Sequence, residues 1–322
     1  MTIFRILLWL ALAPATAFAQ QAYPTMPVRM VIPFAPGSAA DLVGRILQPR
    51  LSELLNQQLV IENHPDASGN IAVEAVARSA ADGYTILLGN VETIAINPAV
   101  FPKLAVDPLR DLAAVTQVVD LPGVLVAHPS FPARTVKELA AYAKANPGKV
   151  NYASPGSGSQ NRLEGEHLRK IAGLDMAHVP YKQGAGAALA ALVAGEAHIM
   201  FVAASSAMAM IESGRLKALA VTGPKRVERL PGTPTMQEAG FSGFESASWQ
   251  GVFVPTGTPP EAVHRLFVAL RETMNSPDVI EHLRRGGVEV AFSDSPTAFT
   301  LFVGRESQRW AKAAKDAGAI VD

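Results

Sequence analysis

Two glycine-rich loops carry the residue types that could hold an anion. The first, PFAPGSAAD at residues 33–41, lies between an apolar run and a segment with helical spacing. A helix N-terminus exposes unpaired backbone N–H groups and the positive end of the helix dipole, and Gly37 would let a ligand approach the backbone closely. This combination predicts an anion site. Ser38 and Asp41 also match an S-x-x-D capping box, so their side chains could instead serve only the turn.

The second loop, SPGSGSQNR at residues 154–162, has three serines and two glycines before another helical segment. Its hydroxyl and amide groups could surround a carboxylate, and Arg162 could add a charged, forked donor. The alternative is a flexible loop with Arg162 in water. Neither loop has the G-K-[ST] or G-x-G-x-x-G spacing of nucleotide sites. Two such pockets on hinged lobes would grip a dianion, or a monocarboxylate with a polar tail.

Strand-like and helix-like segments alternate along the chain, which predicts an α/β fold with a mostly parallel sheet. The unit of strand, glycine-rich loop and helix occurs twice, near residues 28–41 and 150–162. Capping boxes predict helix starts at Thr135, Thr235 and Thr258. Helices expected at residues 260–274, 277–285 and 296–317 close the chain and should pack on the first unit.

This pattern predicts two domains with two chain crossings, near Asp120 and Ser246. Lobe 1 is expected to contain residues 20–120 and 247–322, and lobe 2 residues 121–246. Trp249 lies in the second crossing, SASWQGVF, where it could line the cleft or pack the hinge.

The N-terminus has the pattern of a secretory signal peptide at residues 1–19. One charge, Arg5, precedes an apolar run at residues 6–12 and an Ala-Phe-Ala sequence at residues 17–19. The run is too short to span a bilayer, so we expect cleavage after Ala19 and a periplasmic protein. An uncleaved N-terminal anchor is the alternative.

Composition excludes several classes of function. The 28 Lys and Arg residues balance the 28 Asp and Glu residues, which argues against nucleic acid as a partner. The absence of cysteine excludes disulfides, a thiolate nucleophile and cysteine-bound metal. No H-x-x-x-H, H-E-x-x-H or G-x-S-x-G motif occurs, so we expect no metal, no cofactor and no catalytic residue. The enzymatic alternative would pair Ser157 with His178 and an aspartate.

Nine motifs in a fixed order carry a family resemblance. They include YPTMPVRMVIPFAPGSAADLVGR, VIENHPDASGN, ADGYTILLGN, AYAKANPGKVNYASPGSGS, HVPYKQGAGA and LPGTPTMQEAG. From Tyr23 to the C-terminus, the chain resembles the substrate-binding receptors of tripartite tricarboxylate transporters, also called Bug receptors. The resemblance implies a two-lobed periplasmic-binding-protein-like fold, type II-like, with the ligand cleft between the lobes. It also implies a small organic carboxylate as ligand: a di- or tricarboxylate, an aromatic acid or an amino acid.

The resemblance implies which residues of this chain line the cleft. With Arg162 added from its place in the second loop, the expected ligand-binding residues are Pro36, Gly37, Ser38, Ala39, Asp41, Asn90, Thr93, Ser154, Ser157, Gly158, Ser159, Tyr181 and Lys182. The implied partners are the membrane permease subunits of a tripartite transporter. The alternative is a sensor kinase, to which the loaded receptor would signal.

Three positions depart from the family pattern. Ser38 replaces the second glycine of the usual P-G-G-x-x-D, and Arg162 stands where the family often has histidine. Glu92 occupies a place that is usually small or neutral. Because an acidic residue beside an anion site is unexpected, either Glu92 points away or the ligand carries a donor such as an amine or hydroxyl.

Overall fold

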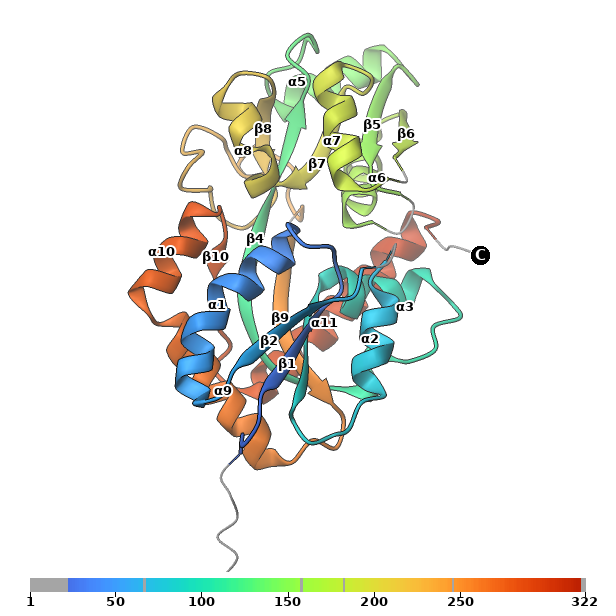
Figure 1. Ribbon diagram of the computed structural model, residues 1–322. Helices are drawn as coiled ribbons and strands as arrows, with labels where there is room; N and C mark the ends of the chain where they lie inside the picture. The colour runs from blue at the N-terminus through green and yellow to red at the C-terminus, as the bar shows by residue number, and fades with distance from the viewer. Residues whose placement is uncertain (1–22, 66–67, 157–158, 182, 245, 320–322) are drawn as a thin grey trace, which may run out of the picture.

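The computed structural model describes residues 23–65, 68–156, 159–181, 183–244 and 246–319. These residues form two lobes, one above the other in Figure 1. The predicted signal peptide lies outside the described residues. The division into lobes at residues 120/121 and 246/247 stays a prediction. Each lobe has its own part of the sheet and its own hydrophobic clusters, as described below.

The lower lobe is built on a mixed sheet with the strand order β2-β1-β3-β9-β4. β1 pairs in parallel with β2 and β3, whereas β9 runs antiparallel to both β3 and β4. A short strand, β10, pairs with β4. The bounds are β1 Val28–Ile32, β2 Leu59–Asn63, β3 Thr85–Asn90, β4 Leu112–Ala127, β9 Ala247–Pro255 and β10 Glu289–Val290.

Helices cover both faces of this sheet. Two hydrophobic clusters, one on each face, join them to it: the first includes α1 and α9, and the second includes α2 and α11. The prediction that the C-terminal helices pack on the first unit is therefore confirmed (Figure 1). The bounds are α1 Ala39–Leu55, α2 Asn70–Ala77, a π-helical turn η1 Glu92–Ile96, α3 Asn97–Val100, α4 Pro108–Asp111, α9 Pro260–Met274, α10 Pro277–Arg285 and α11 Pro296–Asp316.

The upper lobe repeats the arrangement on a smaller sheet. β5 pairs in parallel with β6 and β7, and β7 and β8 pair antiparallel with β4. Two further hydrophobic clusters lie between this sheet and its helices. The bounds are β5 Val150–Ser154, β6 Met176–Pro180, β7 Ile199–Ala203, β8 Lys217–Val221, α5 Val136–Ala145, α6 Gln160–Ala172, α7 Ala185–Ala194 and α8 Ala204–Glu212.

Strand β4 belongs to both lobes. Its residues 112–122 pair with β9, and its residues 123–127 pair with β7. Figure 1 shows it rising from the lower lobe into the upper one. The two sheets are thus joined by one continuous strand.

Helix α1 shows why the local sequence folds as it does. Val43, Leu47, Leu51 and Leu55 recur at helical spacing, and all four are buried in the lower core. The helix continues through Pro49, which removes one backbone hydrogen bond without ending it. It begins after Ser38, the cap of the first glycine-rich loop, and so holds that loop at the edge of the sheet.

Of the three predicted capping boxes, only the first opens a helix as expected. Thr135 caps α5 by accepting a hydrogen bond from the Glu138 amide. Thr235 and Glu238 bond to each other's backbone, but they form a turn. Thr258 does not cap α9, because its hydroxyl donates to the Pro255 carbonyl instead.

We predict that Gly251→Ala destabilises the fold. A Cβ atom at this position in β9 would lie 2.2 Å from the buried Phe299 ring and 3.0 Å from the Thr116 carbonyl oxygen. Overpacking of this kind lowers the free energy of unfolding by about 1–3 kcal/mol, measurable by urea denaturation. The control is Gly304→Ala in α11, where nothing lies within 4 Å of the added atom. It should be neutral or gain about 0.5–1 kcal/mol, and equal effects of the two changes would contradict the prediction.

Candidate ligand-binding site

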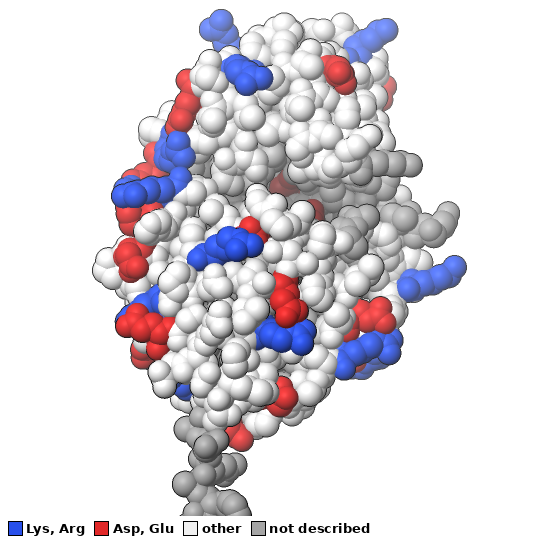
Figure 2. All heavy atoms as spheres, in the orientation of Figure 1, with Lys and Arg blue, Asp and Glu red and all other residues white. Residues whose placement is uncertain are grey.

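The candidate site lies where the two lobes face each other. The loops that follow β1 and β3 come from the lower lobe, and those that follow β5 and β7 come from the upper lobe. Ligands of open α/β sheets bind beyond the carboxyl ends of the strands. Figure 2 shows a hollow between the lobes, with acidic atoms inside it.

The first glycine-rich loop is fixed by Asp41. Its carboxylate accepts hydrogen bonds from the Gly37 amide at 2.9 Å, from Arg45 Nε at 2.9 Å and from Asn63 Nδ2 at 3.1 Å. These hydrogen bonds hold the pKa of Asp41 below its usual value, and the bond from Arg45 has the largest effect. Ser38 accepts from the Asp41 amide at 3.2 Å, but the return bond of a capping box goes to Gly37 instead. Asp41 therefore positions the loop.

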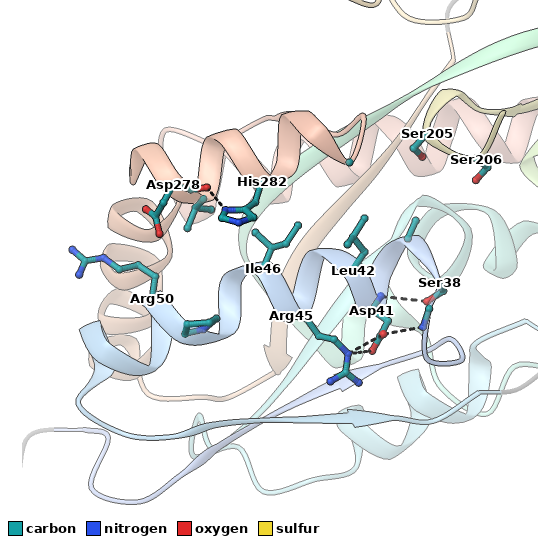
Figure 3. A pocket seen from close by; sticks show the side chains of 15 residues that line it. Ser38, Asp41, Leu42, Arg45, Ile46, Arg50, Ser205, Ser206, Asp278 and His282 are labelled. Atoms are coloured by element: carbon teal, nitrogen blue, oxygen red, sulfur yellow. Dashed lines mark hydrogen bonds and ion pairs between the residues drawn. The ribbon is translucent and has the colours of Figure 1, made fainter. Parts of the chain in front are cut away.

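A pocket of about 610 Å³ begins at this loop and extends between α1 and α10. Figure 3 shows Ser205 and Ser206, at the start of α8, on the opposite side from Ser38. Residues of both lobes therefore line it. Of the expected site residues, it brings together Gly37, Ser38, Ala39 and Asp41.

The other expected residues that the structure describes do not line this pocket. Pro36 is exposed beside Gly37. Ser157, Gly158 and Lys182 lie outside the described residues. The expected residues that are described elsewhere in the structure, away from this pocket's lining, are Asn90, Thr93, Ser154, Ser159, Arg162 and Tyr181.

Asn90 and Thr93 are engaged with each other. The Thr93 amide donates to Asn90 Oδ1 at 3.0 Å, and the Asn90 amide donates to Thr93 Oγ1 at 3.1 Å. Both residues are buried, Thr93 completely. The pair shapes the turn from β3 into η1, and so places Glu92, between them in sequence, at the lobe boundary.

Ser154 contacts His178, whereas Ser157 lies outside the described residues. The Ser154 hydroxyl lies 2.6 Å from His178 Nε2, and the imidazole stacks on Tyr152. Burial, followed by the nearby Arg162 charge, lowers the pKa of His178 to about 4, so the ring is neutral near pH 7. Ser154 has no exposed surface, and its hydroxyl connects the end of β5 to the middle of β6.

The start of α6 holds the next expected residues. Ser159 caps the helix, accepting from the Arg162 amide at 3.3 Å and donating to the Gly156 carbonyl at 2.8 Å. Arg162 is partly buried in the first turn of α6. The Tyr181 amide donates to the Ser154 carbonyl at 2.8 Å, which connects this loop to the end of β6.

A polar network, which we call the boundary network, joins the lobes at α6. It consists of Glu92, Gln160, Glu164 and Ser246. Glu92 Oε1 accepts from the Gln160 amide at 3.3 Å. Gln160 Nε2 donates to Ser246 Oγ at 3.0 Å, and Ser246 Oγ donates to Glu164 Oε1 at 2.6 Å. Sequence reasoning noticed Glu92 as unusual but missed the other three.

The boundary network contains two carboxyl groups with raised pKa values. The pKa of Glu164 is raised to about 7, mainly by burial and further by the Glu92 charge. The hydrogen bonds from Ser246 and Gln160 act in the opposite direction. Burial also raises the pKa of Glu92, and the Gln160 amide works in the opposite direction. Removal of water is the main cause at both positions.

Trp249 packs inside the lower lobe and does not line the cleft. It is 1% exposed, contacts the rings of Phe299 and Phe302, and donates from Nε1 to Glu306 at 3.1 Å. Of the two alternatives drawn from the sequence, packing at the hinge is the one that the structure shows.

The described residues contain neither a metal-ion cluster nor a membrane-spanning helix. Within that part of the chain, no group of three or more His, Asp or Glu side chains is arranged to hold a metal ion. None of the helices described there combines the length and apolar character needed to cross a membrane.

Comparison with known proteins decides the family. A model described as "Tripartite tricarboxylate transporter family receptor" matches residues 43–318. The chain belongs to this receptor family. The receptor is 34% identical to protein BugT of Bordetella pertussis (strain Tohama I), over 95% of this chain and 93% of BugT. The family predicted from the motifs is confirmed.

Solved structures of similar proteins agree with the receptor's fold. Rpa4515 of R. palustris, described with adipate, has a TM-score of 0.83 and 35% identity, covering 92% of this receptor and 98% of that chain. MatC (Rpa3494) from Rhodopseudomonas palustris, with bound malate, has a TM-score of 0.79 and 32% identity, covering 90% and 99%. The periplasmic binding protein BugD has a TM-score of 0.79 and 34% identity, covering 92% and 99%. The predicted two-lobed fold class is confirmed.

We predict that Glu164 makes the receptor's stability depend on pH. The folded-state pKa of Glu164 is raised from 4.5 to about 7. Its contribution to the free energy of unfolding is therefore fully present below pH 4.5 and is lost as the pH rises through 7. The loss amounts to at most about 3 kcal/mol. Glu164→Gln can still accept both hydrogen bonds but does not titrate, so its free energy of unfolding should fall less between pH 4.5 and 8.

Urea denaturation across this pH range is the measurement. The control is Glu74→Gln in α2, where the side chain is 39% exposed and pairs with Arg78. This control should keep the pH dependence of the parent chain. Parallel curves for the parent chain and Glu164→Gln would contradict the prediction.

Proposed function

We propose that this receptor is a periplasmic solute-binding protein that captures a small organic carboxylate for a tripartite tricarboxylate-type transporter. The ligand is held without covalent chemistry between lobe 1, residues 20–120 and 247–322, and lobe 2, residues 121–246. One observation carries the proposal: the N-termini of α1 and α8, from different lobes, line the same pocket. Each presents unpaired N–H groups and the positive end of a helix dipole, and serine hydroxyls lie beside them.

The comparisons support this ligand class. The similar proteins Rpa4515 and MatC are described with adipate and malate. Both are carboxylates, and they differ in length and in substituents, so the class carries over more readily than the ligand itself. The family description supports a transporter as the partner, through its permease subunits. The predicted signal peptide supports the periplasmic location.

Binding rather than catalysis is the proposed role. The Ser154–His178 contact is the arrangement closest to a nucleophile and base, and the serine is completely buried. We therefore propose that the receptor is not an enzyme.

Thermal unfolding of the chain from Gln20 onward tests the function. The panel contains mono-, di- and tricarboxylates, aromatic acids and amino acids. A ligand present at about 100 times its dissociation constant should raise the free energy of unfolding by about 2.7 kcal/mol, and so raise the unfolding midpoint. A chain freed of co-purified ligand that responds to no compound in the panel would count against carboxylate binding.

We predict that Arg162→Ala weakens binding of the ligand found in this way by about 10-fold or more, because hydrogen bonds to charged groups contribute about 1.5–3 kcal/mol. Isothermal titration calorimetry measures the dissociation constant. Arg169→Ala is the matched control on the same helix: its side chain is 44% exposed and pairs with Glu166. An unchanged dissociation constant in Arg162→Ala would reject a role for Arg162 in binding.

A further inference from the structure

Glu92 places a carboxylate of one lobe at a helix N-terminus of the other. It lies two residues beyond the end of β3 in the lower lobe, and its Oε1 accepts a hydrogen bond from the amide of Gln160, the first residue of α6 in the upper lobe. Helix α6 is 13 residues long and its N-terminus attracts negative charge. The protein's own side chain thus occupies a position where a ligand carboxylate would otherwise be stabilised.

The surroundings of Glu92 add a second carboxyl group. Glu164 lies close enough for the Glu92 charge to influence it, and both belong to the boundary network. The side-chain amide of Gln160 is already used by Ser246 and Glu164. This end of the cleft therefore offers acceptors, and the acidic atoms in the hollow of Figure 2 agree with that character.

The pocket that begins at the first glycine-rich loop has a different character. It is lined by the start of α1, by Ser205 and Ser206 of α8 and, farther along α10, by Asp278, whereas the carboxylate nearest the loop, Asp41, is paired with Arg45. Amide and hydroxyl donors beside this loop suit a ligand carboxylate. A ligand bound between the lobes and long enough to extend from this loop to Glu92 would meet donors first and acceptors second.

We propose that Glu92 is a specificity-determining residue that makes this receptor select carboxylates with a hydroxyl or ammonium group at the far end. This inference rests on the proposed function. A dicarboxylate of the same length would place its second negative charge beside Glu92, where like charges repel. A hydroxyl or ammonium group would instead donate a hydrogen bond to the Glu92 carboxylate.

Calorimetric titration of the chain from Gln20 onward tests this proposal. The probes are succinate, glutarate and adipate, each compared with the ω-hydroxy and ω-amino monocarboxylates of equal length, at pH 8 to favour ionised Glu92. The parent chain should bind the best ω-hydroxy or ω-amino acid at least about 10-fold more tightly than the matched dicarboxylate. Glu92→Gln should lower this ratio by about 10-fold or more.

Two further variants separate charge from structure. Glu92→Asp keeps the charge on a shorter side chain and should keep the preference of the parent chain. Glu74→Gln removes a carboxylate from the surface of α2 and should also leave it unchanged. The unfolding midpoint of each variant without ligand shows that its fold is intact.

The outcomes distinguish the two proposals. Tighter binding of dicarboxylates by the parent chain, or an unchanged ratio in Glu92→Gln, overturns the role of Glu92 and leaves carboxylate binding standing. If no probe binds to the parent chain or to Glu92→Gln although another carboxylate of the thermal panel does, the inference fails and the proposed function stands. If no carboxylate of either set binds, both fail.

Discussion

Strand β4 holds the two lobes together through its backbone hydrogen bonds. A buried strand must have its backbone hydrogen bonds satisfied along its whole length. β4 meets this requirement with β9 over residues 112–122 and with β7 over residues 123–127. The two sheets are therefore held end to end, and the loops at their facing edges meet. Both candidate anion-binding loops occupy those edges because the strands before them are linked to β4: β1 through β3 and β9, and β5 through β7.

The cleft that results is chemically uneven. Asp41, near the start of α1, is surrounded by donors and its pKa is lowered. Glu92 and Glu164, at the start of α6, have pKa values raised by burial. Desolvation and hydrogen bonding thus act in opposite directions on carboxyl groups at two places where the lobes face each other. A small ligand with two different ends could match that difference.

The features that short sequence patterns predicted are those that depend on residues close together in the chain. The loops before α1 and α6 were found because Gly37 and the serine caps mark them, and the apolar stripe of α1 is visible as a period. Helix α8 was missed because it follows β7 with no residue between them, and its N-cap, Ala203, makes no side-chain bond. The Glu92–Gln160 bond joins residues 68 positions apart, so no pattern within a helix or loop could have revealed it. Ser246 and Glu164, 82 positions apart, were missed for the same reason.

The order of the strands along the chain has a consequence for how the protein assembles. All strands of the upper sheet lie within residues 112–221, so that sheet can form as soon as this stretch has emerged. The lower sheet needs β9, between β3 and β4, and its core needs α9 and α11, which come last. In a chain that emerges N-terminus first, β1, β2 and β3 are therefore present before β9, the strand that pairs with β3. The lower lobe, whose first three strands are synthesised before all others, therefore completes its fold last. Until β9 is in place, the edge of β3 is open to incorrect pairing.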